Sequence, residues 1–314
     1  MARAAVIRKG RSAELVDVPA PEPGAGEVRL RLEGSGVCGS DLAVWTGRPW
    51  FEYPRPAGAP GHEGWGVVDA VGEGVERLTE GDRVAGLSYH AYADYDLARA
   101  EDLVPLPEGV DCFPGEALGC AVNVVRRSTI TAGDVVAITG AGFLGCVIGQ
   151  LAADAGARVS AISRRRSSLE KAREMGAAET IALEEPVLER VEELTEGECC
   201  DVVVEAAGVQ STLDLAGPLT KTRGRLVIAG FHQDGPRQVD MQLWNWRGLD
   251  VVNAHERDPR VYVEGIREAA RAVSERRLDP TPLYTHRFGL DEVDRALETA
   301  VERPEGFMKA LVIA

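Results

Sequence analysis

Apolar and polar positions alternate in short runs over the first part of the chain, and the runs end in glycines. The segments GEVRLRLEGSGVCG and GWGVVDAVG both show the two-residue period of a half-buried strand. Glycine and proline dominate residues 47–61, which predicts a loop. Because no long 3.6-residue period interrupts this part, we predict a glycine-rich β domain that resembles a barrel.

The pattern changes near residue 115, where GEALGCAVNVVRRSTI is typical of a helix. From there strand-like cores alternate with amphipathic helical segments, and these cores are VVAIT, RVSAIS, ETIAL, DVVVEAAG and GRLVIAG. Such alternation predicts βαβ units and a parallel, doubly wound sheet. We expect the ending GFMKALVIA to return as a strand to the first domain. Residues 1–116 and 256–314 then form one domain, and residues 117–255 form the other.

Composition narrows the class of protein. A chain of 314 residues suits two domains, and its net charge of −15 argues against a nucleic-acid partner. No apolar run approaches the roughly 20 residues of a membrane span, and residues 1–10 lack the apolar core of a signal peptide. The six cysteines show no C-x-x-C pair and no disulfide-like spacing. We therefore expect a cytoplasmic protein without a membrane or nucleic-acid partner.

A glycine loop between a strand and a helix indicates a dinucleotide site. Gly140, Gly142 and Gly145 form G-x-G-x-x-G in GDVVAITGAGFLGCVIGQ. The spacing permits a tight turn, a close backbone approach to a pyrophosphate, and a helix N-terminus that faces the phosphate. The alternative is a tight turn that binds nothing. The candidate cofactor contacts in and beyond this loop are Gly140, Gly142, Phe143, Leu144, Gly145 and Ala207.

The end of the following strand bears on which nucleotide binds. An NAD site usually places an acidic residue there to hold the ribose hydroxyls. This chain instead has Ser163, followed by Arg164, Arg165 and Arg166. A small hydroxyl leaves room for a 2′-phosphate that guanidinium groups can bind. We therefore predict NADP, with NAD as the alternative, and note that such arginines also occur at solvated helix starts.

Two separate segments supply possible metal ligands. Cys38 lies in GSGVCGSDLAVWTG, and His62 and Glu63 lie in GHEGWG. Thiolate, imidazole and carboxylate are ligands that zinc accepts, and three protein ligands leave one position open for chemistry. Each residue alone also has a structural explanation, as a buried cysteine or a hydrogen-bonded histidine. Together we take them to predict zinc.

With these motifs the chain resembles the zinc-dependent medium-chain alcohol dehydrogenases over nearly its whole length. GHEGWGVVDAVGEGV is similar to the family's GHE-x-x-G-x-x-x-x-x-G signature, GVCGSD to its ligand-bearing segment, and GAGFLG to its nucleotide loop. The resemblance implies an α/β protein with a GroES-like β-barrel catalytic domain and a Rossmann domain. The four cysteines of the family's structural-zinc lobe are missing, which implies one zinc ion per chain.

The match leans to the sorbitol and threonine dehydrogenase branch, where a carboxylate belongs to the zinc ligands. In GEALGCAVN this resemblance places the acid at Glu116, although Ala117 stands where the family has proline. It implies Cys38, His62 and Glu116 as the ligands, with Glu63 adjacent or exchanging. Cys120 is the alternative, because other members use a second thiolate.

The resemblance also implies a mechanism. Zinc would act as a Lewis acid in hydride transfer between an alcohol and the nicotinamide. The histidine that often relays protons in the family is Ala43 here, so Ser40 and the cofactor ribose would carry the hydroxyl proton outward. We expect Asp41 to orient His62, with turn capping as the alternative role.

An aromatic cluster near the predicted loop indicates a substrate class. Trp45, Trp50, Phe51 and Tyr53 lie close together in the sequence. Such a wall can stack on the C–H face of a polyol, cyclitol or sugar-like alcohol, and the residues expected to bond its hydroxyls are Arg48, Glu52 and Asn123. The alternative is ordinary loop packing.

Two other functions remain open from the sequence alone. One is a zinc-free quinone or enone reductase on the same scaffold, and the other is a noncatalytic nucleotide-binding protein. Besides its small-molecule alcohol or ketone substrate, the resemblance implies a homodimer or homotetramer joined through the nucleotide domains.

Overall fold

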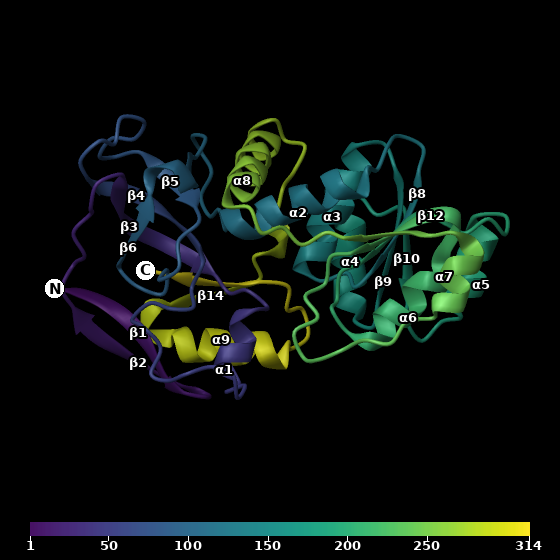
Figure 1. Cartoon of the computed structure of the whole chain (residues 1–314), viewed down its shortest axis with the longest axis horizontal. Helices are drawn as coiled ribbons and strands as arrows, with labels where there is room; N and C mark the ends of the chain where they lie inside the picture. The colour runs from purple at the N-terminus through teal and green to yellow at the C-terminus, as the bar shows by residue number, and fades with distance from the viewer. The chain divides into compact units, whose positions relative to one another are not determined.

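The chain folds into two compact units, described here from a computed structural model that covers residues 1–314. The first unit contains residues 1–119, 257–274 and 283–314, and the second contains residues 120–256 and 275–282 (Figure 1). Helix α2 (Gly115–Ser128) therefore begins in the first unit and continues in the second. None of the helices combines the length and the apolar content that crossing a membrane requires.

The first unit is built on a seven-stranded sheet in which β14, β15, β3, β4, β5 and β7 follow one another and β6 also pairs with β3. The bounds of its strands are β3 (Glu27–Gly36), β4 (Glu63–Val71), β5 (Arg83–Gly86), β6 (Tyr95–Arg99), β7 (Leu103–Pro105), β14 (His286–Gly289) and β15 (Ala310–Ile313). Strand β15 pairs antiparallel with β3. The expected return of the last strand to the first domain is thus confirmed.

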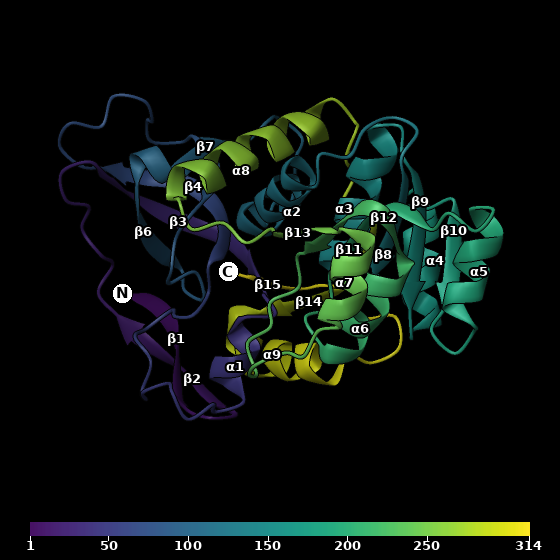
Figure 2. The ribbon, with the colours of Figure 1, turned by 45° about the vertical axis from the view of Figure 1, so that its right-hand side comes forward.

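Two apolar clusters hold the first unit together. One packs the hairpin of β1 (Ala2–Lys9) and β2 (Ser12–Val18) against α1 (Asp41–Trp45) and α9 (Val293–Glu302), which lie side by side in Figure 2. The other fills the space under β3, β4 and β5. Helix α8 (Pro259–Ser274) packs against β5 and β7. Glycines let β3 and β4 approach closely, since a Cβ on Gly66 would lie 2.3 Å from the carbonyl oxygen of Arg31.

The second unit is a parallel six-stranded sheet in the order β10-β9-β8-β11-β12-β13, flanked by helices (Figures 1 and 2). Its strands are β8 (Val135–Thr139), β9 (Arg158–Ser163), β10 (Glu179–Ala182), β11 (Cys200–Glu205), β12 (Thr220–Ile228) and β13 (Asp250–Asn253). Its own helices are α3 (Phe143–Asp154), α4 (Arg166–Glu174), α5 (Val187–Leu194), α6 (Gln210–Leu219) and α7 (Met241–Arg247). The predicted doubly wound parallel sheet is confirmed. The direction of winding reverses between β8 and β11, which is where such sheets bind ligands.

Two details differ from the sequence prediction. The sequence pattern did not predict β13, a four-residue edge strand whose side chains are mostly exposed. Residues 275–282, expected in the first domain, belong to the second unit. Their contacts explain this, because the backbone N–H of Asp279 donates to Gln150 at 3.0 Å and Arg277 pairs with Asp154 at 3.3 Å.

Candidate metal and nucleotide sites

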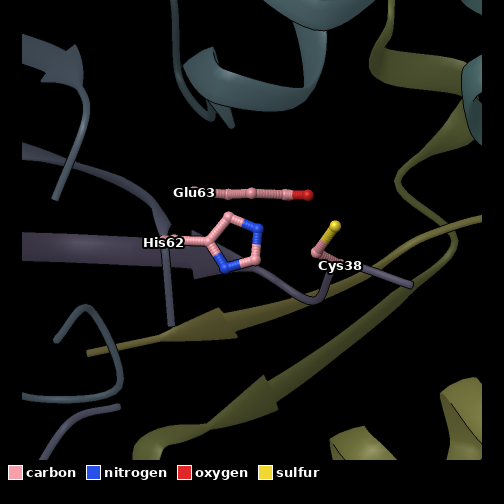
Figure 3. A group of neighbouring side chains, drawn as sticks. All are labelled: Cys38, His62 and Glu63. Carbon is pink, nitrogen blue, oxygen red and sulfur yellow. The ribbon is translucent and has the colours of Figure 1, made fainter. Parts of the chain in front are cut away.

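Three possible metal ligands converge where β3 ends and β4 begins. These strands are antiparallel, and Gly36 on β3 pairs with Glu63 on β4. Cys38 follows β3 and His62 precedes β4, so the pairing brings both to one place. The ligand atoms of Cys38, His62 and Glu63 all lie within 4.8 Å of one another, and Figure 3 shows the three side chains together. Sulfur, nitrogen and oxygen donors at this spacing fit one zinc ion, which binds such ligands at about 2.0–2.3 Å.

The hydrogen bonds of His62 decide which ring nitrogen is available. Nδ1 lies 2.8 Å from the carbonyl oxygen of Pro60 and 3.2 Å from Oδ1 of Asp41. Both oxygens only accept in this arrangement, so Nδ1 carries the hydrogen and Nε2 is left to bind a metal. Burial alone would lower the pKa of His62, but Asp41 and Cys38 raise it well above its ordinary value. Because a metal binds the deprotonated ring nitrogen, metal binding at Nε2 competes with protonation there.

Asp41 connects the two segments that carry the ligands. Its carboxylate is 1% exposed. Oδ2 accepts the backbone N–H of Cys38 at 3.0 Å and the hydroxyl of Tyr92 at 2.6 Å. Asp41 thus closes the turn at residues 38–41 and also contacts His62, so the geometry accommodates both roles considered from the sequence. Burial, with Asp41 close by, raises the pKa of Tyr92 well above its ordinary value and keeps the hydroxyl as a donor.

Glu63 has a cationic partner that the sequence did not reveal. Nζ of Lys309 lies 2.7 Å from Oε1 and 2.6 Å from Oε2, and both side chains are buried. Burial by itself lowers the pKa of Lys309, but Glu63 and Cys38 outweigh it and the pKa is raised. A Cβ on Gly36 would lie 1.8 Å from Oε2 of Glu63, so only glycine leaves room for this carboxylate.

The second candidate carboxylate, Glu116, lies in the first turn of α2. Its Oε2 is 4.0 Å from Nε2 of His62. Glu63 and Glu116 therefore both lie near His62, and Glu116 as the third ligand stays a prediction. Cys120 and Asn123 follow along α2 in the part that belongs to the second unit.

The remaining predicted residues of the first unit divide into core and surface. Ser40 Oγ lies 3.4 Å from Nε2 of His62. Trp45 is only 2% exposed, and its indole N–H donates to Glu298 at 2.8 Å. The burial of Trp45 therefore favours ordinary packing, the alternative considered from the sequence, over a contact with substrate. Trp50 is 57% exposed, and the guanidinium of Arg48 lies 5.9 Å from its ring.

In the second unit, the glycine loop leaves an open face after β8. Gly140 has a φ of +114°, and a Cβ there would lie 2.9 Å from Ala207. A Cβ on Gly145 would lie 2.1 Å from the carbonyl oxygen of Gly140, which explains the close packing of α3 on β8. A Cβ on Gly142 would meet nothing within 4 Å. Gly142 precedes Phe143 and Leu144 at the start of α3, where a phosphate can approach the backbone.

A buried acid supports this loop from the end of β11. Glu205 is 0% exposed, and its Oε1 accepts the backbone N–H groups of Ala207 at 2.9 Å and Gly208 at 2.8 Å. His232 Nε2 lies 2.9 Å from Oε2. Glu205 therefore fixes Ala207, against which Gly140 packs. The sequence places this acid at the end of a strand but gives no sign of its partners.

The basic segment lies at the junction of β9 and α4. Ser163 is the last residue of β9, and its Oγ accepts the backbone N–H of Arg165 at 3.2 Å. Arg164 is exposed. Arg166 pairs with Glu184 at 3.7 Å on the surface. The junction therefore places a hydroxyl and guanidinium groups, the chemistry that a phosphate group accepts hydrogen bonds from, at the end of β9.

Each of the two units has a counterpart among known protein families. Residues 24–108 match the alcohol dehydrogenase GroES-like domain, and residues 144–271 match the zinc-binding dehydrogenase domain. A sorbitol dehydrogenase from Gallus gallus is 30% identical, over 96% of this chain and 94% of its own length. A zinc-binding dehydrogenase from Sinorhizobium meliloti, solved with NADP, is 27% identical with a TM-score of 0.88 and covers 100% of this chain and 99% of its own. An alcohol dehydrogenase from Escherichia coli, solved with NADH, is 26% identical with a TM-score of 0.88 and the same coverage.

Proposed function

Because the chain belongs to the zinc-binding alcohol dehydrogenase family with a GroES-like domain, we propose that it transfers a hydride between a secondary alcohol and NADP(H). The single observation that carries this proposal is the convergence of Cys38, His62 and Glu63 within 4.8 Å, in a chain that also has the glycine loop after β8.

The roles proposed for individual residues follow from their contacts. Cys38, His62 and Glu116 would hold the zinc ion, with Glu63 adjacent to it. When bound, the metal supplies a Lewis acid for the alcohol oxygen, and the nicotinamide supplies the hydride acceptor. Asp41 and the carbonyl oxygen of Pro60 orient His62 through Nδ1, so that Nε2 is left for the metal.

Ser40 is the proposed proton carrier. Its Oγ is 3.4 Å from Nε2 of His62, so it lies beside the position where a substrate hydroxyl would bind. A hydroxyl accepts and donates at once, so Ser40 would take the substrate proton and release its own proton toward water. Ala43 offers no alternative at the position of the usual relay histidine.

We propose polyols, cyclitols or sugar-like alcohols as the substrate class. The exposed ring of Trp50 next to Arg48 provides one apolar face and one hydrogen-bond donor, which suits an alcohol with several hydroxyls. Asn123 remains a proposed contact. The sorbitol dehydrogenase relative supports the same class.

The cofactor preference rests on the junction of β9 and α4. Ser163 stands where NAD-binding sites usually carry an acid, and arginines follow it. The solved neighbours include one with NADP and one with NADH, so they are consistent with either nucleotide. We therefore propose NADP on the basis of Ser163, Arg164 and Arg165.

We propose a homodimer or homotetramer joined through the second unit. Apolar side chains are unusually exposed along α7 and β13, with Trp246 at 88%, Met241 at 52% and Val251 at 40%. Strand β13 is also the edge of its sheet and can pair with another chain.

The six free cysteines support a reducing cytoplasm as the compartment.

The proposed function is tested with a panel of polyols, cyclitols, sugars and simple secondary alcohols, each assayed with NADP and NAD. Zinc content is measured on the same preparation. We expect one zinc per chain and a higher kcat/KM with NADP on at least one polyhydroxy alcohol. Undiminished turnover in thoroughly zinc-stripped protein, or reduction of quinones or enones alone, would favour the zinc-free reductase instead.

A further inference from the structure

Tyr92 lies at the candidate metal centre although no sequence motif points to it. It precedes β6, and its side chain is 0% exposed. Its hydroxyl donates to Oδ2 of Asp41 at 2.6 Å, across 51 residues of sequence. A hydroxyl this deep in a protein needs a partner, and here the partner is the carboxylate that contacts both ligand segments.

The contacts of Asp41 show what this hydrogen bond does. Oδ2 also accepts the backbone N–H of Cys38 at 3.0 Å, and Oδ1 lies 3.2 Å from Nδ1 of His62. A carboxylate that is 1% exposed depends on such donors, because water does not reach it. Each donor also limits how the carboxylate can rotate. The hydrogen bond from Tyr92 therefore restricts rotation of the Asp41 carboxylate. It fixes the orientation in which that carboxylate contacts Cys38 and His62.

The backbone around Tyr92 is joined to the turn that carries His62. The N–H of Tyr92 donates to Gly58 at 3.0 Å, and the N–H of Ala91 donates to Gly61 at 2.9 Å. A Cβ on Gly61 would lie 2.7 Å from the nitrogen of Tyr92 and 2.9 Å from its Cγ. The Tyr92 ring thus packs directly on the turn before His62. Packing needs only the ring, whereas the contact with Asp41 needs the hydroxyl.

We propose that Tyr92 is a positioning residue of the metal centre, whose hydroxyl orients Asp41 so that Cys38 and His62 keep the geometry that binds zinc. This inference rests on the proposed function, since it concerns the same metal site. Tyr92 is joined to Asp41 by a hydrogen bond of 2.6 Å, and Oδ1 of Asp41 in turn approaches Nδ1 of His62 at 3.2 Å, which leaves Nε2 of the ring for a metal. Partners behind metal ligands orient the ligand and adjust its basicity.

The test compares Tyr92→Phe with Tyr95→Phe in the full chain. Both changes remove one phenolic oxygen from the same segment, but Tyr95 packs under the guanidinium of Arg29, 5.6 Å from its ring centre. The zinc dissociation constant is measured by competition with a chromogenic chelator, and the visible absorption of the cobalt-substituted protein reports ligand geometry. We expect Tyr92→Phe to bind zinc roughly tenfold more weakly, at the lower limit for loss of such a partner, and to alter the cobalt spectrum. Tyr95→Phe should match the wild type in both.

The possible outcomes separate this inference from the proposed function. If the wild type binds zinc and oxidises alcohols while Tyr92→Phe has wild-type zinc affinity and cobalt spectrum, the inference is wrong and the function stands. If the wild type binds no zinc, both are wrong. Should Tyr92→Phe not fold, Asp41→Asn provides the second variant, because it alters the group through which Tyr92 acts. We expect it to weaken zinc binding at least as much, and a wild-type affinity there would overturn the inference.

Discussion

Replacing Lys309 with methionine tests the buried ion pair beside the candidate metal centre. Lys309 is 5% exposed and Glu63 is 0% exposed, so neither group has access to bulk water. Methionine has a similar volume but no charge, and the variant leaves a buried carboxylate without its cation. Removing one partner of a buried ion pair costs about 3–5 kcal/mol. We expect the free energy of unfolding of the first unit to fall by about this amount in zinc-free protein.

The assay is urea denaturation followed by tryptophan fluorescence, since Trp65 in β4 is 1% exposed and changes environment when the first unit unfolds. Lys9→Met at the exposed end of β1 is the matched control and should leave stability unchanged. The double variant Glu63→Gln with Lys309→Met should recover most of the loss, because no buried charge then remains. Added zinc should also reduce the loss, since a cation near Glu63 replaces the missing one.

The result that would refute this reasoning is a loss below about 1 kcal/mol in the single variant, which is no more than an average substitution costs. A double variant as unstable as the single one would also contradict it. The damage would then come from altered packing and not from an uncompensated charge.

Further predictions concern the metal, the cofactor and the assembly. Removing zinc with a chelator should abolish alcohol oxidation while NADP still binds, as measured by fluorescence titration, and retained turnover would contradict the metal's role. Gly142→Ala should keep its thermal stability but bind NADP more weakly. Gly145→Ala should unfold more easily, because its Cβ would lie 2.1 Å from a carbonyl oxygen. Equal thermal stability of the two variants would contradict this packing argument. Arg164→Ala should lower kcat/KM with NADP roughly tenfold or more, because a hydrogen bond to a charged group contributes about 1.5–3 kcal/mol, and an equal loss with NAD would exclude a 2′-phosphate contact. Trp246→Glu should shift the protein to a smaller species in analytical ultracentrifugation, and an unchanged mass would place the interface elsewhere.

The second unit was predictable because buried parallel strands appear in the sequence as apolar runs. The cores VVAIT and RVSAIS coincide with β8 and β9 as the structure has them. Strand β13 was missed for the opposite reason. Its side chains are mostly exposed. Although it pairs with β12, its sequence therefore shows no apolar pattern that would distinguish it from a loop.

The candidate metal centre was predictable only in part. Cys38, His62 and Glu63 lie in recognisable motifs, whereas the contacts of Tyr92 and Lys309 span 51 and 246 residues and arise only when the sheet forms. Trp45 shows the converse limit. The sequence places Trp45 in an aromatic cluster, but in the structure its ring is buried and its N–H donates to Glu298, 253 residues away. Local pattern identifies residue types suited to chemistry, and tertiary pairing decides which of them face one another.

The position of Lys309 in the chain has a consequence for how the protein matures. The ribosome makes Cys38 and His62 early, then all of the second unit's sheet, and only afterwards the strand β15 that pairs with β3. Domains generally fold as units during synthesis, so the second unit can fold on the ribosome while the first still lacks its last strands. Lys309 cannot compensate Glu63 until that late segment has emerged. The backbone beside Cys38 depends on the same segment, because the N–H of Val37 donates to the carbonyl oxygen of Ala310 at 2.9 Å. The ligand geometry is therefore expected to be complete only after translation, and a nascent chain stalled before residue 309 should bind zinc more weakly than the full chain.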